Sequence, residues 1–375
     1  MSSTRILTDL FSHSGTWFLR DYMQCREAYL SQLQSLPSFN GVESRSWCLS
    51  KEDALYCDTT WLGQKDARSV VIIISGTHGV EGYCGSAVQR FLLGRYQAGD
   101  LILPNNVAML IVHSLNPWGM KYGRRCDQEG IDLNRNVIDF NQLPAVLPEY
   151  SLCLEKLTQT DDKGRETLMQ KYAQQYGQSG FDRIFSGGQY HCSWGPFYGG
   201  TKPSWSSQLI DSIVVDYQLA ARKLVVIDVH SGLGPWGFGE LISDHPAGSA
   251  GEHFACSLFG PAVASVEEGN SFSVSKFGLQ DYRWHKLMEQ DGCFLTLEFG
   301  TYGTDELFNV LLNDHLLWRN KDTSDPMFSD QQALQNSQQG AMLEHFCPDQ
   351  LLWQQSVLFK SWQVISQTLK GLSDA

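Results

Sequence analysis

A continuous run of β-branched residues, Val70–Ile74, constrains the fold of this chain more than any other stretch. The run has no polar face, which is typical of a strand that is buried on both sides in a parallel sheet. It therefore predicts an α/β fold. In open α/β sheets the functional sites lie at the carboxyl ends of the strands, so the residues that follow Ile74 are the first candidates for chemistry.

The strand leads directly into the glycine-rich turn Ser75–Gly82, which places His78 and Glu81 three residues apart. If this segment forms a helical turn, both side chains can point at one metal ion. The three glycines of the turn allow a sharp bend and a close approach to a ligand. The spacing alone also fits a capped turn with a surface histidine. The position at the end of a buried strand favours metal binding.

Two later apolar segments, Lys223–His230 and Cys293–Phe299, predict further core strands that carry polar side chains near their ends. In the first strand, Asp228 and His230 share a face, so Asp228 can lie behind His230 as a supporting carboxylate. In the second strand, Glu298 is out of character for a buried position. A buried carboxylate is costly unless it pairs with a cation or takes part in catalysis.

These strand ends together supply the ligands of a catalytic metal site. His78, Glu81 and His230 would bind one zinc ion through three side chains and leave a position for water, the arrangement of catalytic rather than structural zinc. Zinc can lower the pKa of a bound water to roughly 7. Glu298 is then the candidate general base for the attack of that water on a carbonyl group.

A polar loop follows another predicted core strand, Val107–Leu115. Residues 124–136 contain Arg124, Arg125, Asn134 and Arg135 within thirteen positions. Arginine is the side chain best suited to hold a carboxylate through two hydrogen bonds or to stabilise an oxyanion. The alternative interpretation is a solvated surface loop with ion pairs.

The rest of the chain predicts supporting structure. Helical spacing indicates helices at about residues 16–36, 85–96, 147–176, 305–319 and 350–369. We expect residues 1–40 to form an N-terminal helical segment that packs on a single domain, residues 41–375. The loop at 185–205 is rich in glycine and aromatic residues, which favours an ordered loop that covers the site. His191 in this loop could be a ligand, but a hydrogen-bonding role is more common for an isolated loop histidine.

Composition limits the partners and the compartment. The formal net charge is −13 and there is no basic tract, which argues against nucleic acid or an anionic membrane as a partner. Neither a signal-peptide pattern nor an apolar run of ~20 residues is present. Ten scattered cysteines without a Cys-x-x-Cys pair indicate free thiols in a reducing compartment. We expect a cytoplasmic protein that acts on small molecules; its oligomeric state stays open.

Two other enzyme classes are disfavoured by local sequence. The glycine pattern at residues 232–237 matches a dinucleotide-binding fingerprint, but Pro235 and the strand-like segment Gly239–Ser243 stand where the phosphate-binding helix should begin. A serine hydrolase is disfavoured because no Gly-x-Ser-x-Gly sequence occurs.

The ordered set of motifs resembles the carboxypeptidase A-like zinc peptidases and the related aspartoacylase and succinylglutamate desuccinylase group. The resemblance extends over roughly residues 55–305 and is more specific as a series than any one motif. The series comprises His78-x-x-Glu81, Asn116-Pro117-x-Gly119, Arg125 five residues before Gly130, Asp132-Leu133-Asn134-Arg135-Asn136, Asp228-x-His230-Ser231 and Glu298.

The resemblance implies a mixed, mainly parallel twisted sheet with helices on both faces in a zinc carboxypeptidase-like catalytic domain. It also implies zinc on the two histidines and the first glutamate, with Glu298 as the general base. Arg125 would stabilise the oxyanion, and Arg124 competes for that role. Asn134 and Arg135 would hold a substrate carboxylate. Tyr282 is the candidate counterpart of the mobile tyrosine of the carboxypeptidases.

The sequence therefore predicts a zinc-dependent hydrolase of amide or peptide bonds in a small molecule or peptide with a free carboxylate. The carboxypeptidase type is the leading hypothesis. A deacylase of N-acyl amino acids is the alternative, because the sequence does not define what surrounds the scissile bond. A non-catalytic metal-binding module is disfavoured, since every expected chemical residue is present.

Overall fold

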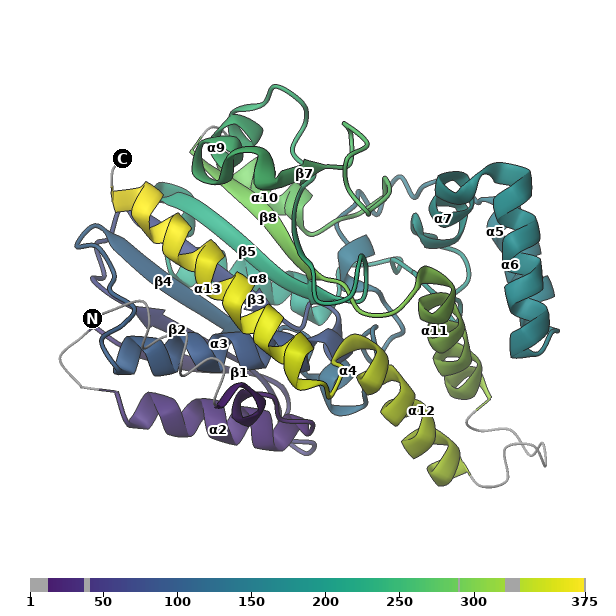
Figure 1. Cartoon of the computed structure of the whole chain (residues 1–375), viewed down its shortest axis with the longest axis horizontal. Helices are drawn as coiled ribbons and strands as arrows, with labels where there is room; N and C mark the ends of the chain where they lie inside the picture. Colours follow the sequence, from purple (N-terminus) through teal and green to yellow (C-terminus); the bar gives the residue numbers. More distant parts are fainter. Residues whose placement is uncertain (1–12, 37–40, 289–290, 321–330, 374–375) are drawn as a thin grey trace.

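The computed structural model describes residues 13–36, 41–288, 291–320 and 331–373. Its centre is an eight-stranded sheet with the strand order β1-β2-β4-β3-β5-β8-β6-β7 (Figure 1). The strands are β1 (Glu43–Ser50), β2 (Leu55–Leu62), β3 (Ser69–Ser75), β4 (Val107–His113), β5 (Lys223–Ser231), β6 (Gly239–Ser243), β7 (Val263–Ser265) and β8 (Gly292–Phe299).

The helices surround this sheet. The α-helices are α2 (Tyr22–Gln34), α3 (Gly82–Gln97), α4 (Pro117–Lys121), α5 (Pro148–Thr158), α6 (Asp162–Tyr176), α7 (Gln178–Ser186), α8 (Trp205–Asp216), α9 (Ala250–Phe259), α10 (Asp281–Met288), α11 (Thr304–Arg319), α12 (Gln331–Phe346) and α13 (Leu351–Ser373). Short 3-10 turns are η1 (Ser14–Trp17), η2 (Gly79–Glu81), η3 (Leu133–Arg135), η4 (Leu219–Ala221) and η5 (Gly260–Ala262).

The sheet is mixed and mainly parallel, as predicted. Strands β4, β3, β5 and β8 run parallel to one another and form its middle. The hairpin of β1 and β2 adds an antiparallel edge, and β6 is antiparallel to β8 on the other side. The middle strands therefore end together, which brings the predicted site residues to one edge of the sheet.

Helices cover both faces of the sheet because alternate residues of the buried strands point to opposite sides. Val71 and Ile73 belong to a core cluster that includes residues of α3 and α13, whereas Val70 and Ile72 belong to one with residues of α8 and α10. In Figure 1, α13 and α3 cross the near face of the sheet and α8 lies behind it. The predicted strand at Val70–Ile74 is thus buried on both faces.

A third core cluster lies beyond the carboxyl ends of the strands. It joins apolar side chains of α5, α6, α7, α11 and α12, which Figure 1 shows to the right of the sheet. Val80, between the predicted ligands His78 and Glu81, belongs to this cluster and is fully buried. The helical region therefore packs directly against the turn that carries the ligands.

Two predicted boundaries were wrong, each because of a local capping or backbone feature. The N-terminal helix begins at Tyr22 instead of near residue 16, since the Asp21 side chain caps it by accepting a hydrogen bond from the Gln24 N–H. Strand β4 ends at His113 instead of Leu115, because Ser114 takes a positive φ of 62°.

Several other expectations concern the whole chain. Residues 1–12 and 37–40 lie outside the described residues, and the division at residue 40 stays a prediction, although α2 packs on α3. All ten cysteines are described and are free. None of the described helices combines the length and the apolar character that a bilayer span requires.

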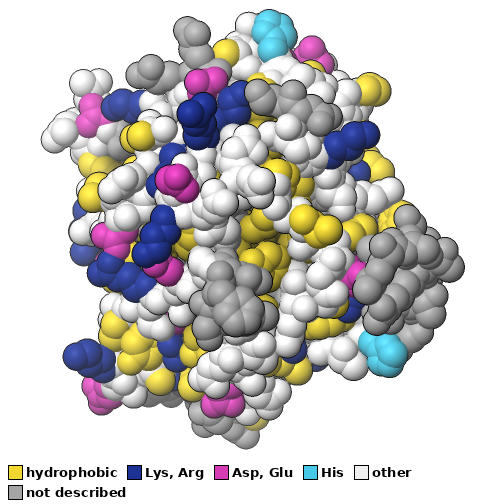
Figure 2. All heavy atoms as spheres, turned by 90° about the vertical axis from the view of Figure 1, so that its left-hand side faces the viewer, with side chains coloured by type: hydrophobic (Ala, Val, Ile, Leu, Met, Phe, Trp, Pro, Cys, Tyr) yellow, Lys and Arg dark blue, Asp and Glu magenta, His cyan; other side chains and the backbone are white. Residues whose placement is uncertain are grey.

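At the end of the molecule away from α5–α7, basic and acidic side chains are mixed around hydrophobic ones (Figure 2).

Candidate active site

The predicted site residues meet at the carboxyl edge of the parallel strands. His78 precedes the turn η2 after β3 and Glu81 ends that turn, while His230 lies near the end of β5 and Glu298 near the end of β8. Because β5 pairs with both β3 and β8, His230 stands between the other groups. His230 and Glu298 are direct partners in the register of the two strands.

The turn that carries His78 and Glu81 is fixed by contact with the arginine loop. The N–H of Gly79 donates to the carbonyl of Arg125 at 3.1 Å, and that of Val80 donates to the carbonyl of Arg124 at 2.9 Å. A Cβ atom at Gly79 would lie 2.1 Å from the carbonyl carbon of Gly119. Only glycine fits there, so the glycine pattern serves a close backbone approach.

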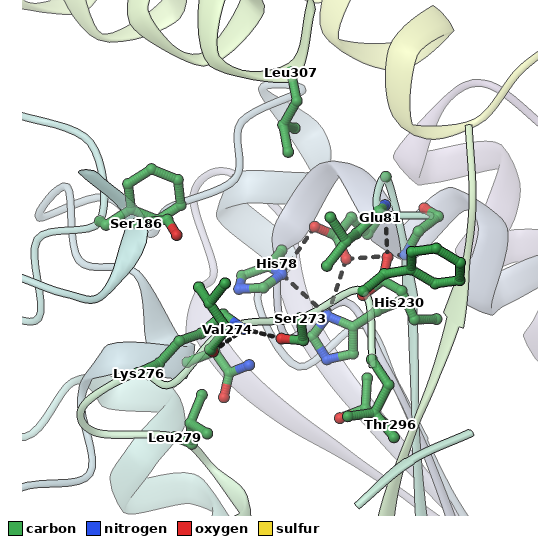
Figure 3. A pocket seen from close by; sticks show the side chains of 18 of the residues that line it. His78, Glu81, Ser186, His230, Ser273, Val274, Lys276, Leu279, Thr296 and Leu307 are labelled. Carbon is green, nitrogen blue, oxygen red and sulfur yellow. Dashed lines mark hydrogen bonds and ion pairs between the residues drawn. The ribbon is translucent and has the colours of Figure 1, made fainter. Parts of the chain in front are cut away.

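His78, Glu81 and His230 form a group of metal-ligand atoms that all lie within 4.8 Å of one another. The two Nδ1 atoms of the histidines are 3.1 Å apart. Nδ1 of His78 lies 2.8 Å from Oε1 of Glu81, and Nδ1 of His230 lies 3.0 Å from Oε2. All three side chains are buried, and Figure 3 shows them converging on one side of the pocket.

The outer ring nitrogens of both histidines contact carboxylates. Nε2 of His78 lies 3.1 Å from Oδ1 of Asp132, and Nε2 of His230 lies 2.8 Å from Oδ2 of Asp228. The Thr77 hydroxyl donates to Asp228 in turn. These contacts favour the proton on Nε2 of each histidine and leave Nδ1 free to bind a metal.

The donor set fits a divalent cation such as zinc. Two imidazole nitrogens and a carboxylate, each oriented by an outer partner, match the ligands and supports of catalytic zinc sites. Burial alone would raise the pKa of Glu81, but His78 and His230 lower it below its ordinary value, so the carboxylate stays ionised. The two inward-facing Nδ1 atoms have each other and the Glu81 carboxylate as their partners among the described residues, and that carboxylate also accepts from the Ser231 N–H at 3.1 Å.

Glu298 lines the same pocket as the three ligands and is the buried carboxyl group expected from the sequence. Its Oε1 accepts a hydrogen bond from the backbone N–H of Leu233 at 3.1 Å. Burial, and then the negative charge of Glu81, raise the pKa of Glu298 to about 7. A carboxyl group in this condition can accept and release a proton near neutral pH.

Of the two competing arginines, the structure brings Arg125 to the site. Its Nη1 donates to Oε1 of Glu81 at 2.9 Å and its Nε donates to Oδ2 of Asp132 at 3.0 Å. Its Nη2 makes no hydrogen bond to any residue that the structure describes. Arg124 instead donates to Asp314 at 2.8 Å and does not line the pocket.

Arg135 also lines the pocket, and its guanidinium has no carboxylate partner among the residues with described positions. Its Nε and Nη2 donate to the carbonyl of Ser186 at 3.1 and 2.7 Å, and its Nη1 donates to that of Asn134. No ion pair of Arg135 is found in the described part of the chain, although the side chain is buried. Such a guanidinium is suited to hold a substrate anion.

Asn134 lines the pocket beside Arg135. Its side-chain oxygen accepts a hydrogen bond from the Gln280 N–H at 2.8 Å, which orients the amide. The Nδ2 group has no partner among the residues with described positions. It can therefore donate to a ligand.

The glycine- and aromatic-rich loop is ordered and forms part of the pocket wall. It runs from the end of α7 to the start of α8; Ser186 at the end of α7 and Phe197 in the loop line the pocket. The guanidinium carbons of Arg125 and Arg135 lie 5.3 and 5.4 Å from the ring centroid of Phe197. His191 lies 3.1 Å from the Ser151 hydroxyl, away from the metal ligands.

Tyr282 is not among the residues that line the pocket. It lies in the first turn of α10, its side chain is exposed, and its hydroxyl donates to the backbone carbonyl of Lys276 at 3.1 Å. The structure therefore does not bring Tyr282 to the other predicted residues, because the helix start directs its side chain outward.

Four charged pocket residues were missed from the sequence: Asp182, Asp244, Lys276 and Asp281. The ammonium of Lys276 donates to the Ser273 hydroxyl and to the carbonyl of Val274 at 3.0 Å, and Figure 3 shows it across the pocket from Glu81. Burial, and then the charge of Arg135, lower the pKa of Lys276 to about 8. Single charged residues in loops and at element ends have no spacing pattern that could have marked them.

Comparison with protein families gave a match over residues 18–360 to the family described as "Protein of unknown function (DUF2817)". The chain belongs to the DUF2817 family. A search of the curated proteins gave no match for this DUF2817 chain.

Solved structures show what the fold of this DUF2817 chain is similar to. Carboxypeptidase A from Helicoverpa armigera matches with a TM-score of 0.54 and 14% identity, over 99% of this chain and 80% of that one. The succinylglutamate desuccinylase from Chromobacterium violaceum matches with a TM-score of 0.37 and 17% identity, over 80% and 75% of the two chains. The match to the first structure confirms the predicted carboxypeptidase-like fold.

A murein-tripeptide amidase from Escherichia coli O157 also matches, with a TM-score of 0.36 and 15% identity, over 76% of this chain and 93% of that one.

Proposed function

We propose that this DUF2817 protein is a zinc-dependent hydrolase that cleaves an amide bond in a substrate with a free carboxylate, in the manner of a carboxypeptidase. The observation that carries the proposal is the convergence of His78, Glu81 and His230 with Glu298 in one pocket. The carboxypeptidase-like fold supports it.

The three ligands would hold one zinc ion through Nδ1 of each histidine and the carboxylate of Glu81. When bound, zinc would act as a Lewis acid towards the scissile carbonyl and lower the pKa of water to about 7. Asp132 and Asp228 keep the two imidazoles in the orientation that this binding requires.

Glu298 would act as the general base and then as the general acid. In the first step its carboxylate accepts a proton from the attacking water, whose oxygen forms a bond to the carbonyl carbon. In the second step the carbon–nitrogen bond breaks, and Glu298 returns the proton to the departing nitrogen. The hydrogen bond from the Leu233 N–H holds the carboxylate in one position for both steps.

Two arginines have separate proposed roles. Arg125 has donors that no described residue uses, so it can stabilise the negative charge that develops on the carbonyl oxygen, a contribution typically worth about 3 kcal/mol per donor. Arg135 and the free amide group of Asn134 can hold the substrate carboxylate. This assignment uses the one pocket guanidinium in the described residues that lacks a carboxylate partner.

A deacylase of N-acyl amino acids is the alternative, and the helical wall of the pocket fits this activity as well. Side chains of α7 and α11, including Asp182, Ser186 and Leu307, line the pocket together with the metal ligands. A wall of this kind suits a short acyl group as well as the end of a peptide.

The experiment is amine release by the zinc-loaded protein, with N-acyl amino acids and short peptides that share the same terminal residue. We expect hydrolysis that a chelator abolishes and zinc restores. Faster turnover of peptides supports the carboxypeptidase type, and faster turnover of N-acyl amino acids supports the deacylase. Absence of metal-dependent hydrolysis with both substrate series would contradict the proposal.

A further inference from the structure

A pair of carboxylates in the pocket takes no part in the mechanism above. Asp244 follows the end of β6 and Asp281 begins α10, and both line the pocket that contains the metal ligands. Apolar pocket residues accompany them: Ile242 and Leu279 lie two positions before the two acids, and the Phe294 N–H is bonded to His245, the residue after Asp244. The region thus combines apolar walls with two acids.

Asp281 is 97% buried, yet its carboxylate lacks partners. Neither oxygen makes a hydrogen bond to the described residues. Nε2 of His285 lies 3.8 Å from Oδ2, beyond hydrogen-bond distance, and is itself without a partner. The backbone N–H groups of Tyr282 and Asp281 are close enough to lower the pKa of the carboxyl group, but neither donates to its oxygens in ordinary hydrogen-bond geometry, and the Tyr282 N–H donates to the Leu279 carbonyl instead.

A buried carboxylate in this condition requires a donor that the described residues do not supply. An acid in the first turn of a helix normally accepts backbone N–H groups, and Asp281 does not. Asp244 likewise has no hydrogen bond or ion pair in the described part of the chain. Burial, and then the charge of Asp244, raise the pKa of Asp281, as expected when two carboxylates share one space without a cation between them.

The ammonium of Lys276 interacts electrostatically with both acids, but it forms no ion pair with either of them. Its charge lowers the pKa of Asp244 and of Asp281, whereas its hydrogen bonds go to Ser273 and Val274. If Arg135 holds the substrate carboxylate, the ammonium of Lys276 is the positive charge that remains near the two negative charges of Asp244 and Asp281. A further positive charge is therefore favourable in this region.

We propose that Asp281 and Asp244 form a subsite for a cationic side chain, an ammonium or a guanidinium, on the residue of the substrate that carries the free carboxylate. This inference rests on the proposed function, because it places the carboxylate of that residue at Arg135. The methylene groups of a lysine-like side chain would pack on Ile242, Leu279 and Phe294. The charged end would donate hydrogen bonds to the vacant oxygens of Asp281.

The test compares substrates that differ in one group. Peptides and N-acyl amino acids that end in lysine, norleucine or glutamate are offered to the zinc-loaded protein. Norleucine keeps the side-chain methylenes and replaces the ammonium with a methyl group. We expect kcat/KM for lysine to exceed that for norleucine by roughly tenfold to hundredfold, the usual worth of a charge-assisted hydrogen bond, and glutamate to be the poorest.

Variants test whether the preference for lysine over norleucine depends on Asp281. Asp281→Asn should reduce the lysine-to-norleucine ratio by at least about tenfold. Asp291→Asn is the matched control, since Asp291 is exposed and precedes β8 at the end of the strand opposite the site; the ratio should stay as in the wild type. Equal kcat/KM for lysine and norleucine in the wild type, or an unchanged ratio in Asp281→Asn, overturns the subsite.

A binding measurement separates this inference from the proposed function. Calorimetry with free L-lysine and L-norleucine, on the wild type and on Asp281→Asn, needs no turnover. Tighter binding of lysine that Asp281→Asn abolishes supports the subsite even if no amide is cleaved, in which case the proposed function alone fails. Equal binding of the two amino acids to the wild type overturns the subsite whatever the activity.

Discussion

Arg135→Lys tests whether a guanidinium holds the substrate carboxylate. The substitution keeps the positive charge but removes the planar group that can donate two parallel hydrogen bonds. Lysine can retain one of the two bonds, so the loss is about one charge-assisted hydrogen bond, ~1.5–3 kcal/mol. This corresponds to a fall in kcat/KM of roughly tenfold to 150-fold. The carboxylate takes no part in the breaking of the amide bond, so the effect should appear mainly in KM.

The assay measures kcat and KM for two substrates that differ only at the end of the chain, a free acid and its carboxamide. Arg135→Lys should reduce the ratio of kcat/KM for the acid to that for the amide. Arg222→Lys is the matched control, since the Arg222 guanidinium also donates to backbone carbonyls and does not line the pocket. Both variants lose backbone hydrogen bonds, so their Tm values show how much of any change is structural.

An equal loss for the acid and the amide would refute this assignment of Arg135. In that case the arginine would act on activity only through its bonds to the carbonyls of Ser186 and Asn134, which position the pocket wall.

Three further outcomes are expected. Burial lowers the pKa of His113 to about 4, below the ordinary 6.5. The unfolded state therefore binds a proton at a higher pH than the folded state does. The contribution of His113 to the free energy of unfolding is complete above pH 6.5 and falls by roughly 3 kcal/mol as the pH drops to 4. Chemical denaturation of His113→Asn should show a smaller loss, and an unchanged pH dependence would contradict the assignment. Asp228→Ala should weaken zinc binding about tenfold to hundredfold in chelator competition, and unchanged affinity would exclude its supporting role. Gly79→Ala should abolish stoichiometric zinc binding because its Cβ meets the backbone of Gly119, whereas Gly340→Ala, with open space around it, should bind zinc normally.

The sequence predicted the sheet and the convergence of His78, Glu81 and His230, because both depend on local signals. The apolar run at Val70–Ile74 could only be a buried strand, and polar groups at the ends of such strands stand out against their surroundings. The register of β5 and β8 then placed His230 beside Glu298, as parallel strands with a common end require. The choice of Arg125 over Arg124 followed from its distance along the chain to Gly130.

The parts that were missed depend on tertiary contacts. Helix α12 is rich in glutamine and was not predicted; it is held by Met342, Leu343 and Phe346, which are buried only because other elements meet them. The missing partners of Arg135 and Asp281 are visible only once the surrounding elements are placed. Tyr282 was assigned by similarity of residue type, and the direction of α10 could not be read from the sequence.

The decisive measurement is the turnover of Glu298→Gln with its zinc content determined on the same sample. Glutamine keeps the size of the side chain and removes its ability to accept the proton of the attacking water. We predict about one zinc ion per chain in both proteins and a loss of kcat by roughly 10²-fold to 10⁴-fold in the variant. Full turnover by a zinc-loaded Glu298→Gln protein would contradict the mechanism.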